Sequence, residues 1–233
     1  MLQPRASHEY YPTPQSHICG ALDICLADID DPVVVIDPGA GRGEWGRLIK
    51  ERWPTCILVG IEFFHKPDPE VYKFYDEWLK KNYMLWKPSY PVNLIIGNPP
   101  YGDPWEQGIH IAKKKAKTNG LDWKVPKRPA NLPRADAEAF IRHSIKILPL
   151  NKSGNLLFLL RLAFLESATR AYGLWAEYPP TDVWICAERP SFTGNGKTDA
   201  TAYMFSRWCS EIDIDRPTVE FYGHFMRLKG NTK

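Results

Sequence analysis

The chain lacks the residue patterns that mark disulfide frameworks, metal sites and membrane segments. Its five cysteines include no Cys-x-x-Cys pair and its six histidines lack metal-ligand spacing, so we expect a reducing compartment and no metal. The longest apolar stretch, residues 156–165, is interrupted by Arg161 and is too short to span a membrane. The first five residues contain no apolar segment that could act as a signal peptide. These absences predict a cytoplasmic protein.

The composition is that of a globular domain. Of the 233 residues, 44% are hydrophobic, and the mean hydropathy is -0.38. At this length we expect one α/β domain over residues 1–233, with a short C-terminal tail over residues 209–233 that carries no readable motif. The net charge of +3 permits a nucleic-acid partner but does not require one.

Apolar runs that stop at glycine, proline or polar residues predict buried strands, and segments with helical spacing lie between them. The predicted strands cover residues 33–36, 56–61, 92–97, 155–160, 182–187 and 200–208, the last pairing antiparallel. The predicted helices cover residues 16–26, 70–80, 135–148 and 165–172, and a further helix ends near residue 52.

A glycine-dense loop, residues 37–46, follows the first predicted strand. Such loops let backbone amides approach a ligand at a helix N-terminus. Gly41-x-Gly43-x-x-Gly46 matches the dinucleotide fingerprint, and Glu62 at the end of the second strand is suitably placed to hold a ribose. A nicotinamide dehydrogenase is therefore one interpretation. Against it, Asp37 would repel a pyrophosphate, whereas it would attract a cofactor that carries an ammonium and a sulfonium.

A second motif, Asn98-Pro99-Pro100-Tyr101, follows the strand predicted at residues 92–97, where open α/β sheets bind their ligands. The Asn98 amide oxygen and the carbonyl of Pro99 can each accept a proton of an amino group. Tyr101 offers a flat face on which a ring can stack. Accepting both protons of a conjugated amine directs its lone pair at an electrophile, so this motif suits transfer to nitrogen.

Together the two motifs resemble those of S-adenosylmethionine-dependent methyltransferases, above all the adenine-N6 DNA methyltransferases. The resemblance covers roughly residues 10–207 and implies a Rossmann-like class-I methyltransferase fold, a seven-stranded, mostly parallel, doubly wound sheet with an antiparallel last strand. It implies that S-adenosylmethionine is the cofactor, that Asn98, Pro99, Pro100 and Tyr101 are the catalytic motif, and that Asn98 also borders the cofactor. The implied contacts of the methionine moiety are Asp37, Pro38, Gly39, Ala40, Gly41 and Gly43, and Glu62 is implied to hold the ribose.

Three weaker matches extend the resemblance. Tyr11-Pro12-Thr13-Pro14 resembles the motif in which an aromatic residue and a threonine touch the methionine end of the cofactor. Residues 81–86 occupy the place of the third strand, and Asn82 stands where the family's acidic residue meets the adenine of the cofactor. The Arg-Pro-x-Phe sequence that ends at Phe192 resembles the motif whose aromatic ring stacks on the flipped base opposite Tyr101.

The segment between the second motif and the helix at residues 135–148 is strongly basic. Residues 113–134 contain eight Lys and Arg against one Asp, and Pro104, Pro126, Pro129 and Pro133 predict a proline-broken loop over about residues 103–134 without a long helix. Such a loop beside a catalytic motif indicates a nucleic-acid clamp. The candidate phosphate contacts are Lys113, Lys114, Lys115, Lys127 and Arg128.

The expected activity is thus methyl transfer to the N6 amino group of adenine in DNA, by base flipping and direct transfer. An RNA adenine-N6 methyltransferase would use the same loop. A protein glutamine methyltransferase carries the same motif, and a catalytically silent nucleic-acid binder is a further alternative. Because no recognition domain of the usual size is visible in the sequence, a protein partner could supply target recognition.

Overall fold

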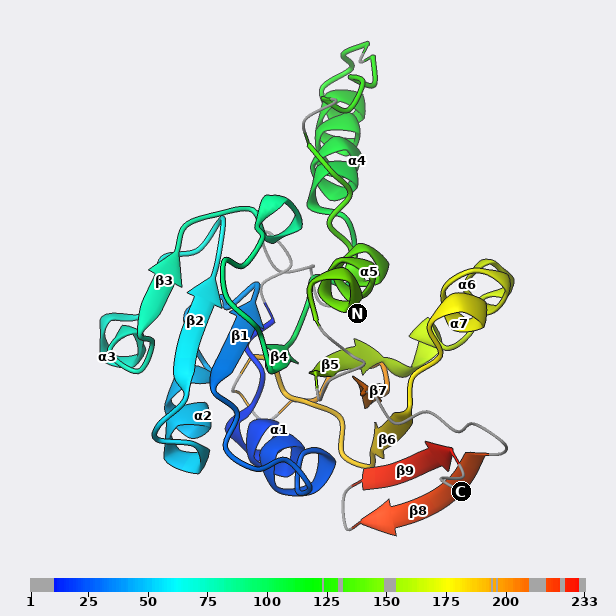
Figure 1. Ribbon diagram of the computed structural model, residues 1–233. Helices are drawn as coiled ribbons and strands as arrows, with labels where there is room; N and C mark the ends of the chain where they lie inside the picture. Colours follow the sequence, from blue (N-terminus) through cyan, green and yellow to red (C-terminus); the bar gives the residue numbers. More distant parts are fainter. Residues whose placement is uncertain are drawn as a thin grey trace.

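The computed structural model describes residues 11–122, 124–129, 132–148, 154–193, 195 and 197–209, together with the backbone of residues 217–222 and 225–230. Its strands form one sheet, drawn in Figure 1. They are β1 (Val34–Pro38), β2 (Ile57–Ile61), β3 (Glu77–Leu79), β4 (Leu94–Gly97), β5 (Asn155–Arg161), β6 (Asp182–Cys186), β7 (Tyr203–Trp208), β8 (Pro217–Tyr222) and β9 (Phe225–Gly230).

The sheet has the order β3-β2-β1-β4-β5-β7-β6-β9-β8. Strands β1 to β5 pair parallel with their neighbours, and β7 lies antiparallel between β5 and β6. The first seven strands therefore have the predicted arrangement, mostly parallel with an antiparallel last strand. The expected positions of six of the seven strands are also confirmed.

Helices cover both faces of the sheet, as a doubly wound fold requires. Between them and the central strands lie two separate apolar clusters. One contains residues of α1 (Gln15–Gly20), of the π-helical turn Ala21–Cys25 and of α2 (Gly46–Arg52), and the other contains residues of α5 (Ala137–Ile147) and α7 (Leu174–Glu177). The helix α6 (Ala168–Tyr172) precedes α7 beyond the end of β5. Because β1, β4 and β5 are buried on both faces, they are continuous apolar runs in the sequence.

Residues 63–91 differ from the prediction. The helix expected at residues 70–80 is only the short α3 (Pro69–Tyr72), and the third strand is β3, earlier in the chain than the expected 81–86. The chain leaves the helix because the Asp76 carboxylate accepts the N–H of Leu58 at 2.7 Å and pairs with Lys50 at 2.6 Å. Glu77 then pairs with Val59 as the strand joins the sheet. Tertiary pairing thus outweighs the helical spacing of the apolar residues.

Two strands come from a region in which the sequence analysis found no motif. The hairpin β8–β9 extends the sheet beyond β6, with β9 antiparallel to β6 along five residue pairs from Asp182 with Lys229 to Cys186 with Phe225. The sheet therefore has nine strands rather than seven. The hairpin covers the backbone of β6, which would otherwise form an open edge.

The basic segment is not the proline-broken loop that was expected. Its first half is the fifteen-residue helix α4 (Pro104–Thr118), which projects away from the sheet in Figure 1. Pro104 occupies the first turn, where backbone N–H groups have no acceptor within the helix, so the missing N–H of proline costs no hydrogen bond. The Asp103 carboxylate caps the helix by accepting the N–H groups of Trp105 and Glu106. The other prolines lie beyond residue 118, so they do not interrupt the helix.

Candidate active site

The predicted site residues meet at the carboxyl ends of three adjacent strands. Strand β1 pairs with β2 on one side and β4 on the other, so the segments that follow these strands leave the same edge of the sheet. Asp37 lies near the end of β1, Glu62 follows β2, and Asn98 follows β4. The tertiary structure therefore brings the glycine loop and the Asn-Pro-Pro-Tyr motif together, as expected for a ligand site in an α/β sheet.

The glycine loop turns sharply over the end of β1. Gly39, Gly41 and Gly43 have φ angles of 69°, 62° and 99°, which residues with a side chain adopt only with strain. The N–H groups of Gly39 and Ala40 donate to the Ile61 carbonyl at 2.8 and 3.2 Å. The loop is therefore fixed against the neighbouring strand β2 before any ligand arrives.

Asp37 is 1% exposed, and its two carboxylate oxygens have different surroundings. The Tyr75 hydroxyl donates to Oδ2 at 2.7 Å, whereas Oδ1 has no hydrogen-bond partner among the described residues. Burial raises the pKa of Asp37 to about 8; the hydrogen bond from Tyr75 acts in the opposite direction, and the charges of Glu44 and Glu62 add to the rise. A buried carboxylate with one open oxygen suits a cationic ligand, which would restore its ionised form.

Tyr75 is a site residue that the sequence analysis missed, because it falls within the helix predicted at residues 70–80. Its ring packs against Gly46 and Gly60, and its hydroxyl thereby reaches Asp37. A Cβ atom on Gly46 would lie 2.3 Å from the Tyr75 ring, and one on Gly60 would lie 2.9 Å from it. Gly46, the last glycine of the dinucleotide-like fingerprint, therefore makes room for a tyrosine of the protein itself. The signal in the sequence was the pair of small residues in α2 and β2.

Thr13 supplies a second open oxygen. Its side chain is 5% exposed, and its Oγ1 is buried with no hydrogen-bond partner among the residues described. Thr13 Oγ1 and Asp37 Oδ1 both belong to residues predicted to hold the methionine end of S-adenosylmethionine. Buried polar atoms usually have partners, so these two fit a ligand that brings an ammonium group. The described residues gather no group of three or more His, Cys, Asp or Glu that could hold a metal ion.

The predicted ribose contact, Glu62, is already bonded to the loops around it. Its Oε2 accepts the N–H of Gly41 at 2.9 Å, and its Oε1 accepts the N–H groups of Phe64 and His65 at 2.6 and 3.0 Å. A carboxylate has about four lone-pair positions, and the three N–H groups leave about one of them for a hydroxyl donor. Asn82, the predicted adenine contact, uses its amide oxygen to cap the 3-10 turn Tyr83–Leu85 and keeps its amide N–H groups as donors.

The Asn98 side chain is held at both ends. Its Nδ2 donates to the Tyr11 carbonyl at 2.9 Å, and its Oδ1 accepts the Tyr101 hydroxyl at 2.5 Å. The first bond fixes which end of the amide is the acceptor. Because an amide oxygen has two lone pairs, Oδ1 can accept a further proton from an amine. The motif thus presents an oriented acceptor at the end of β4.

Tyr101 of the motif belongs to a cluster of four aromatic rings. Tyr11 lies 5.8 Å from Tyr101 and 5.4 Å from Phe192, and Tyr203 lies 5.7 and 5.2 Å from the same two rings. Phe192 is 9% exposed, so it packs in the cluster and does not face Tyr101 across an open slot. The guanidinium of Arg161 lies 4.8 Å from the centre of the Tyr101 ring. A base could enter only if a ring such as Tyr11 moved aside.

Arg161 and Tyr203 were not among the predicted site residues. They face each other in the register of β5 and β7, where the antiparallel strand reaches the catalytic edge. Burial raises the pKa of the Tyr203 hydroxyl, partly offset by Arg161 beside it. The signal in the sequence was the charge of Arg161 at the end of an otherwise apolar run.

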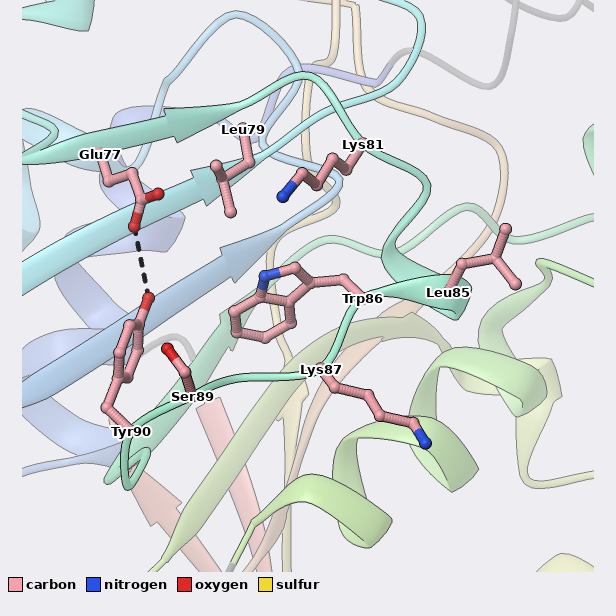
Figure 2. Close-up of a pocket in the computed structure, with 8 residues that line it drawn as sticks. All are labelled: Glu77, Leu79, Lys81, Leu85, Trp86, Lys87, Ser89 and Tyr90. Atoms are coloured by element: carbon pink, nitrogen blue, oxygen red, sulfur yellow. Dashed lines mark hydrogen bonds between the residues drawn. The ribbon is translucent and has the colours of Figure 1, made fainter.

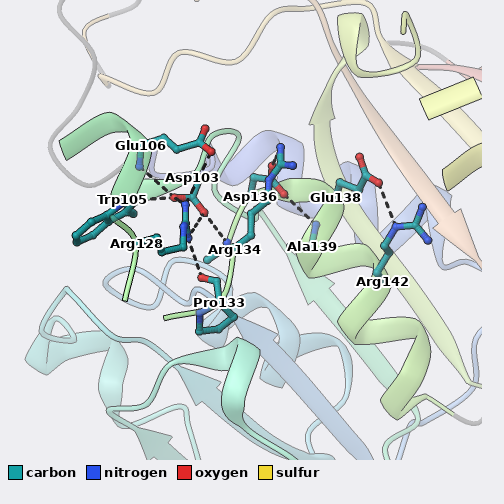
Figure 3. A network of polar contacts seen from close by, with 11 residues as sticks. Asp103, Trp105, Glu106, Arg128, Pro133, Arg134, Asp136, Glu138, Ala139 and Arg142 are labelled. Atoms are coloured by element: carbon teal, nitrogen blue, oxygen red, sulfur yellow. Dashed lines mark hydrogen bonds and ion pairs between the residues drawn. The ribbon is translucent and has the colours of Figure 1, made fainter. Parts of the chain in front are cut away.

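The predicted phosphate contacts fall into two groups. Lys113, Lys114 and Lys115 on α4, and Lys127 beyond it, are exposed. Arg128 instead donates to both carboxylate oxygens of Asp103, at 2.6 and 3.1 Å, and to the Pro133 carbonyl (Figure 3). It is therefore part of the base of the insertion.

Asp103, 3% exposed, is the centre of that network (Figure 3). Burial acts to raise the pKa of Asp103, but the Arg128 guanidinium and the backbone N–H groups of Ala135 and Glu106 outweigh it and lower the pKa below its usual value. The charged pair ties residues 103 and 128 together and closes the insertion where it leaves the domain.

A hollow of about 440 Å³ lies elsewhere, against the edge strand β3 (Figure 2). Trp86 and Lys81 face it from the segment after β3, and Tyr90 donates to Glu77 at its rim. None of the predicted cofactor or catalytic residues lines this hollow. We assign it no part in the reaction.

No helix in the described parts of the chain has both the length and the apolar character needed to cross a membrane.

No family model matches the chain. A type II methyltransferase of Thermus thermophilus is 28% identical over 137 residues, which cover 56% of this chain and 30% of that protein. A trans-aconitate 2-methyltransferase of Azoarcus sp. is 32% identical over 77 residues, which cover 30% of this chain and 28% of that protein. The chain thus spans about a third of the length of the curated relatives it matches. These relatives are methyltransferases, which, with the open oxygens of Asp37 and Thr13, supports S-adenosylmethionine as the cofactor.

Two solved structures have a similar architecture. One, of a proposed RNA methyltransferase from Pyrococcus horikoshii, aligns with a TM-score of 0.54 at 14% identity over 88% of both chains. The other, of the modification subunit of a proposed type I restriction enzyme from Vibrio vulnificus, aligns with a TM-score of 0.56 at 14% identity over 86% of this chain and 45% of that one. At such identities the similarity concerns the fold alone. The chain has the class-I methyltransferase fold that the sequence predicted.

Proposed function

We propose that the protein transfers a methyl group from S-adenosylmethionine to the N6 amino group of adenine in DNA. One observation carries the proposal. The Asn98 amide oxygen, an oriented acceptor for an amino group, lies on the loop beside the one that holds Asp37, whose open oxygen suits a cationic cofactor. An acceptor for the amine and an anchor for the methyl donor are thus side by side.

Bound at Asp37, Thr13 and the glycine loop, the cofactor would supply an electrophilic methyl group on a sulfonium. Asn98 Oδ1 and the Pro99 carbonyl would accept the two amino protons and aim the nitrogen lone pair at that methyl carbon. The new N–C bond would form as the C–S bond breaks, the thioether S-adenosylhomocysteine would leave, and the amino group would lose one proton to solvent. Because no covalent enzyme intermediate is involved, the site needs orientation more than a nucleophile.

The aromatic cluster would hold the base. Flipping an adenine from a duplex costs a few kcal/mol, and stacking on an aromatic ring returns about 1–3 kcal/mol. Tyr101 would be the stacking partner, with Arg161 behind its ring, and Phe192 would line the opposite side once Tyr11 has moved. The exposed lysines of the basic segment would contact phosphates.

A transfer assay tests the proposal. The protein is incubated with labelled S-adenosylmethionine and, separately, with duplex DNA, single-stranded DNA, RNA and a release factor, and the digested products are identified by mass spectrometry. N6-methyladenine in DNA is the expected product. If the labelled methyl group is found in RNA or in glutamine, the proposed methyl transfer holds but DNA is not the substrate. Failure to bind the cofactor would overturn the proposal.

Asn98→Ala should lower the rate of methyl transfer at least 100-fold and leave the affinity for the cofactor within a few fold of its original value. The substitution removes the acceptor that orients the amino group but none of the cradle around Asp37. Single-turnover rates and isothermal titration of the cofactor measure the two effects separately. A collapse of cofactor affinity would instead assign Asn98 a structural role.

A further inference from the structure

Helix α4 and the described residues after it, 119–122 and 124–127, form a projection that we call the basic arm. It extends from the catalytic edge away from the sheet, as Figure 1 shows. In α4 only Ala116 is buried, and the arm leaves apolar side chains exposed, with Ile111, Leu121 and Val125 at 66%, 64% and 58%. Trp105, Ile109 and Ala112 share a partly buried face with Ala116, whereas the side of the helix that carries Lys113, Lys114 and Lys115 is exposed and is available to another molecule.

The three consecutive lysines of α4 spread over more than half of the circumference of the helix. Successive residues of an α-helix are about 100° apart, so Lys113, Lys114 and Lys115 spread their side chains over about 200° of its circumference. A flat anionic surface would meet the charges on one side only. A groove with phosphates along both walls would meet all three lysines at once.

The dimensions of the helix favour one kind of groove. With side chains an α-helix is about 10–12 Å across, and the major groove of B-form DNA is about 12 Å wide. The major groove of A-form RNA is deep and narrow and does not admit side chains readily. A helix of this kind therefore fits duplex DNA better than duplex RNA.

The base of the arm has a defined position relative to the catalytic loop. Asp103 lies two residues after Tyr101 and is tied to Arg128 by the ion pair at 2.6 Å. At about 1.5 Å per residue, Lys113 lies about 15 Å along the arm from Asp103. Since base pairs of a duplex are about 3.4 Å apart, this reach corresponds to about four base pairs.

We propose that α4 lies in the major groove of B-form duplex DNA about four base pairs from the target adenine, with its lysines on the phosphates of both strands. This inference rests on the proposed function. In this arrangement the arm gives the methyltransferase domain its own contact with a duplex. Arg128 does not contact phosphate in this arrangement, because it is the anchor of the arm.

The test compares two triple variants of equal charge. Lys113→Gln, Lys114→Gln and Lys115→Gln alter the arm, whereas Lys80→Gln, Lys81→Gln and Lys87→Gln remove three exposed lysines near the edge strand β3. Binding of a 20-base-pair duplex DNA, the same sequence as duplex RNA, and a single strand is measured by fluorescence anisotropy between 50 and 200 mM salt. Circular dichroism checks that both variants fold.

For duplex DNA we expect the arm variant to bind at least tenfold more weakly, with a salt slope reduced by about three. The β3 variant should bind duplex DNA with an affinity within threefold of that of the unaltered protein. The affinity for duplex RNA should change in neither variant. Methyl green, a major-groove ligand, should compete with the protein, and netropsin, a minor-groove ligand, should not. Equal losses in the two variants, equal losses on duplex RNA, or competition by netropsin alone would overturn the inference.

Duplex length gives a separate readout. Duplexes that end two base pairs from the adenine on the arm side should bind at least tenfold more weakly than those that extend six base pairs. If affinity is independent of this length, the arm does not lie where we infer. Groove competition without any methyl transfer would count against the proposed function and leave the docking of the arm intact.

Discussion

At the scale of single residues, the site depends on the different surroundings of the two carboxylate oxygens of Asp37. The Tyr75 hydroxyl donates to Oδ2, and Oδ1 has no hydrogen-bond partner among the described residues. Tyr75 can reach Asp37 only because Gly46 and Gly60 lack side chains. We therefore regard Tyr75 as a positioning residue that acts on the cofactor through Asp37.

Tyr75→Phe should weaken cofactor binding about tenfold, because a hydrogen bond to a charged group is worth about 1.5–3 kcal/mol and the buried carboxylate loses its donor. The ring remains, so the packing against Gly46 and Gly60 is kept. Isothermal titration measures the affinity, and Tyr172→Phe, at a side chain 87% exposed, is the matched control. Unchanged affinity in Tyr75→Phe would show that the hydroxyl serves packing only.

The raised pKa of Asp37 also predicts how stability depends on pH. The folded protein binds a proton at Asp37 up to about pH 8, whereas the unfolded chain releases it near pH 4. In the window between them the folded state holds more protons, so the contribution of this group to stability is present at low pH and is lost as the pH rises through 8.

Relative to Asp37→Asn, the unaltered protein should therefore lose about 2–3 kcal/mol of unfolding free energy between pH 5 and pH 7. The asparagine keeps an acceptor for the Tyr75 hydroxyl but does not titrate. The contributions of all other titrating groups to the unfolding free energy therefore cancel in the comparison. Urea unfolding followed by tryptophan fluorescence provides the values. Parallel curves for the two proteins would mean that Asp37 is ionised throughout this range.

At the scale of elements, the side chain of Asp103 sets where helix α4 of the basic arm begins and in which direction it leaves the domain. The Asp103 carboxylate caps α4, accepts the N–H of Ala135, and pairs with Arg128. One buried carboxylate thus joins the start of the arm to the segment that returns to the domain. The direction of α4 is a consequence of this network.

Arg128→Gln should loosen the base of the arm and leave the sheet unaffected. A buried charge that loses its partner costs about 1–3 kcal/mol, and here the cost falls on local opening. Hydrogen exchange at the amides of Trp105 and Ala135 should accelerate about 10- to 100-fold. Arg134→Gln, which removes a more exposed pair with Asp136, should change these rates less than threefold.

At the scale of the whole molecule, the nine-stranded sheet places the catalytic site far from one of its two edges. The site lies over β2, β1 and β4, one strand in from the β3 edge, whereas the hairpin β8–β9 extends the opposite edge beyond β6. Pairing with β9 covers the β6 backbone along residues 182–186. The hairpin should therefore affect association more than binding at the site.

Deleting residues 210–233 should produce concentration-dependent self-association through the uncovered β6, while cofactor affinity stays within about threefold. Sedimentation velocity at several concentrations measures the first effect, and titration measures the second. A deletion variant that stays monomeric would show that β6 is protected by other means.

Short-range signals account for most of what could be predicted. Apolar runs located six of the seven predicted strands, and the two loop motifs follow strands that the fold places side by side. The hairpin β8–β9 was missed although Thr218-Val219-Glu220-Phe221 alternates polar and apolar residues, because no turn residue pattern was recognised beside it. The long helix α4 was missed because Pro104 was counted as a helix breaker although it occupies the first turn.

By itself the sequence determined the class of fold and the residues of the two motifs, since both depend on patterns within a few residues of each other. Only the tertiary structure decided that residues 73–79 leave a helix for β3, that Tyr75 reaches Asp37, and that Arg128 anchors the arm. Each of these depends on contacts between residues 18 to 38 positions apart. Local propensity is weak beside such contacts, because burial and charge pairing involve groups that only the folded chain brings together.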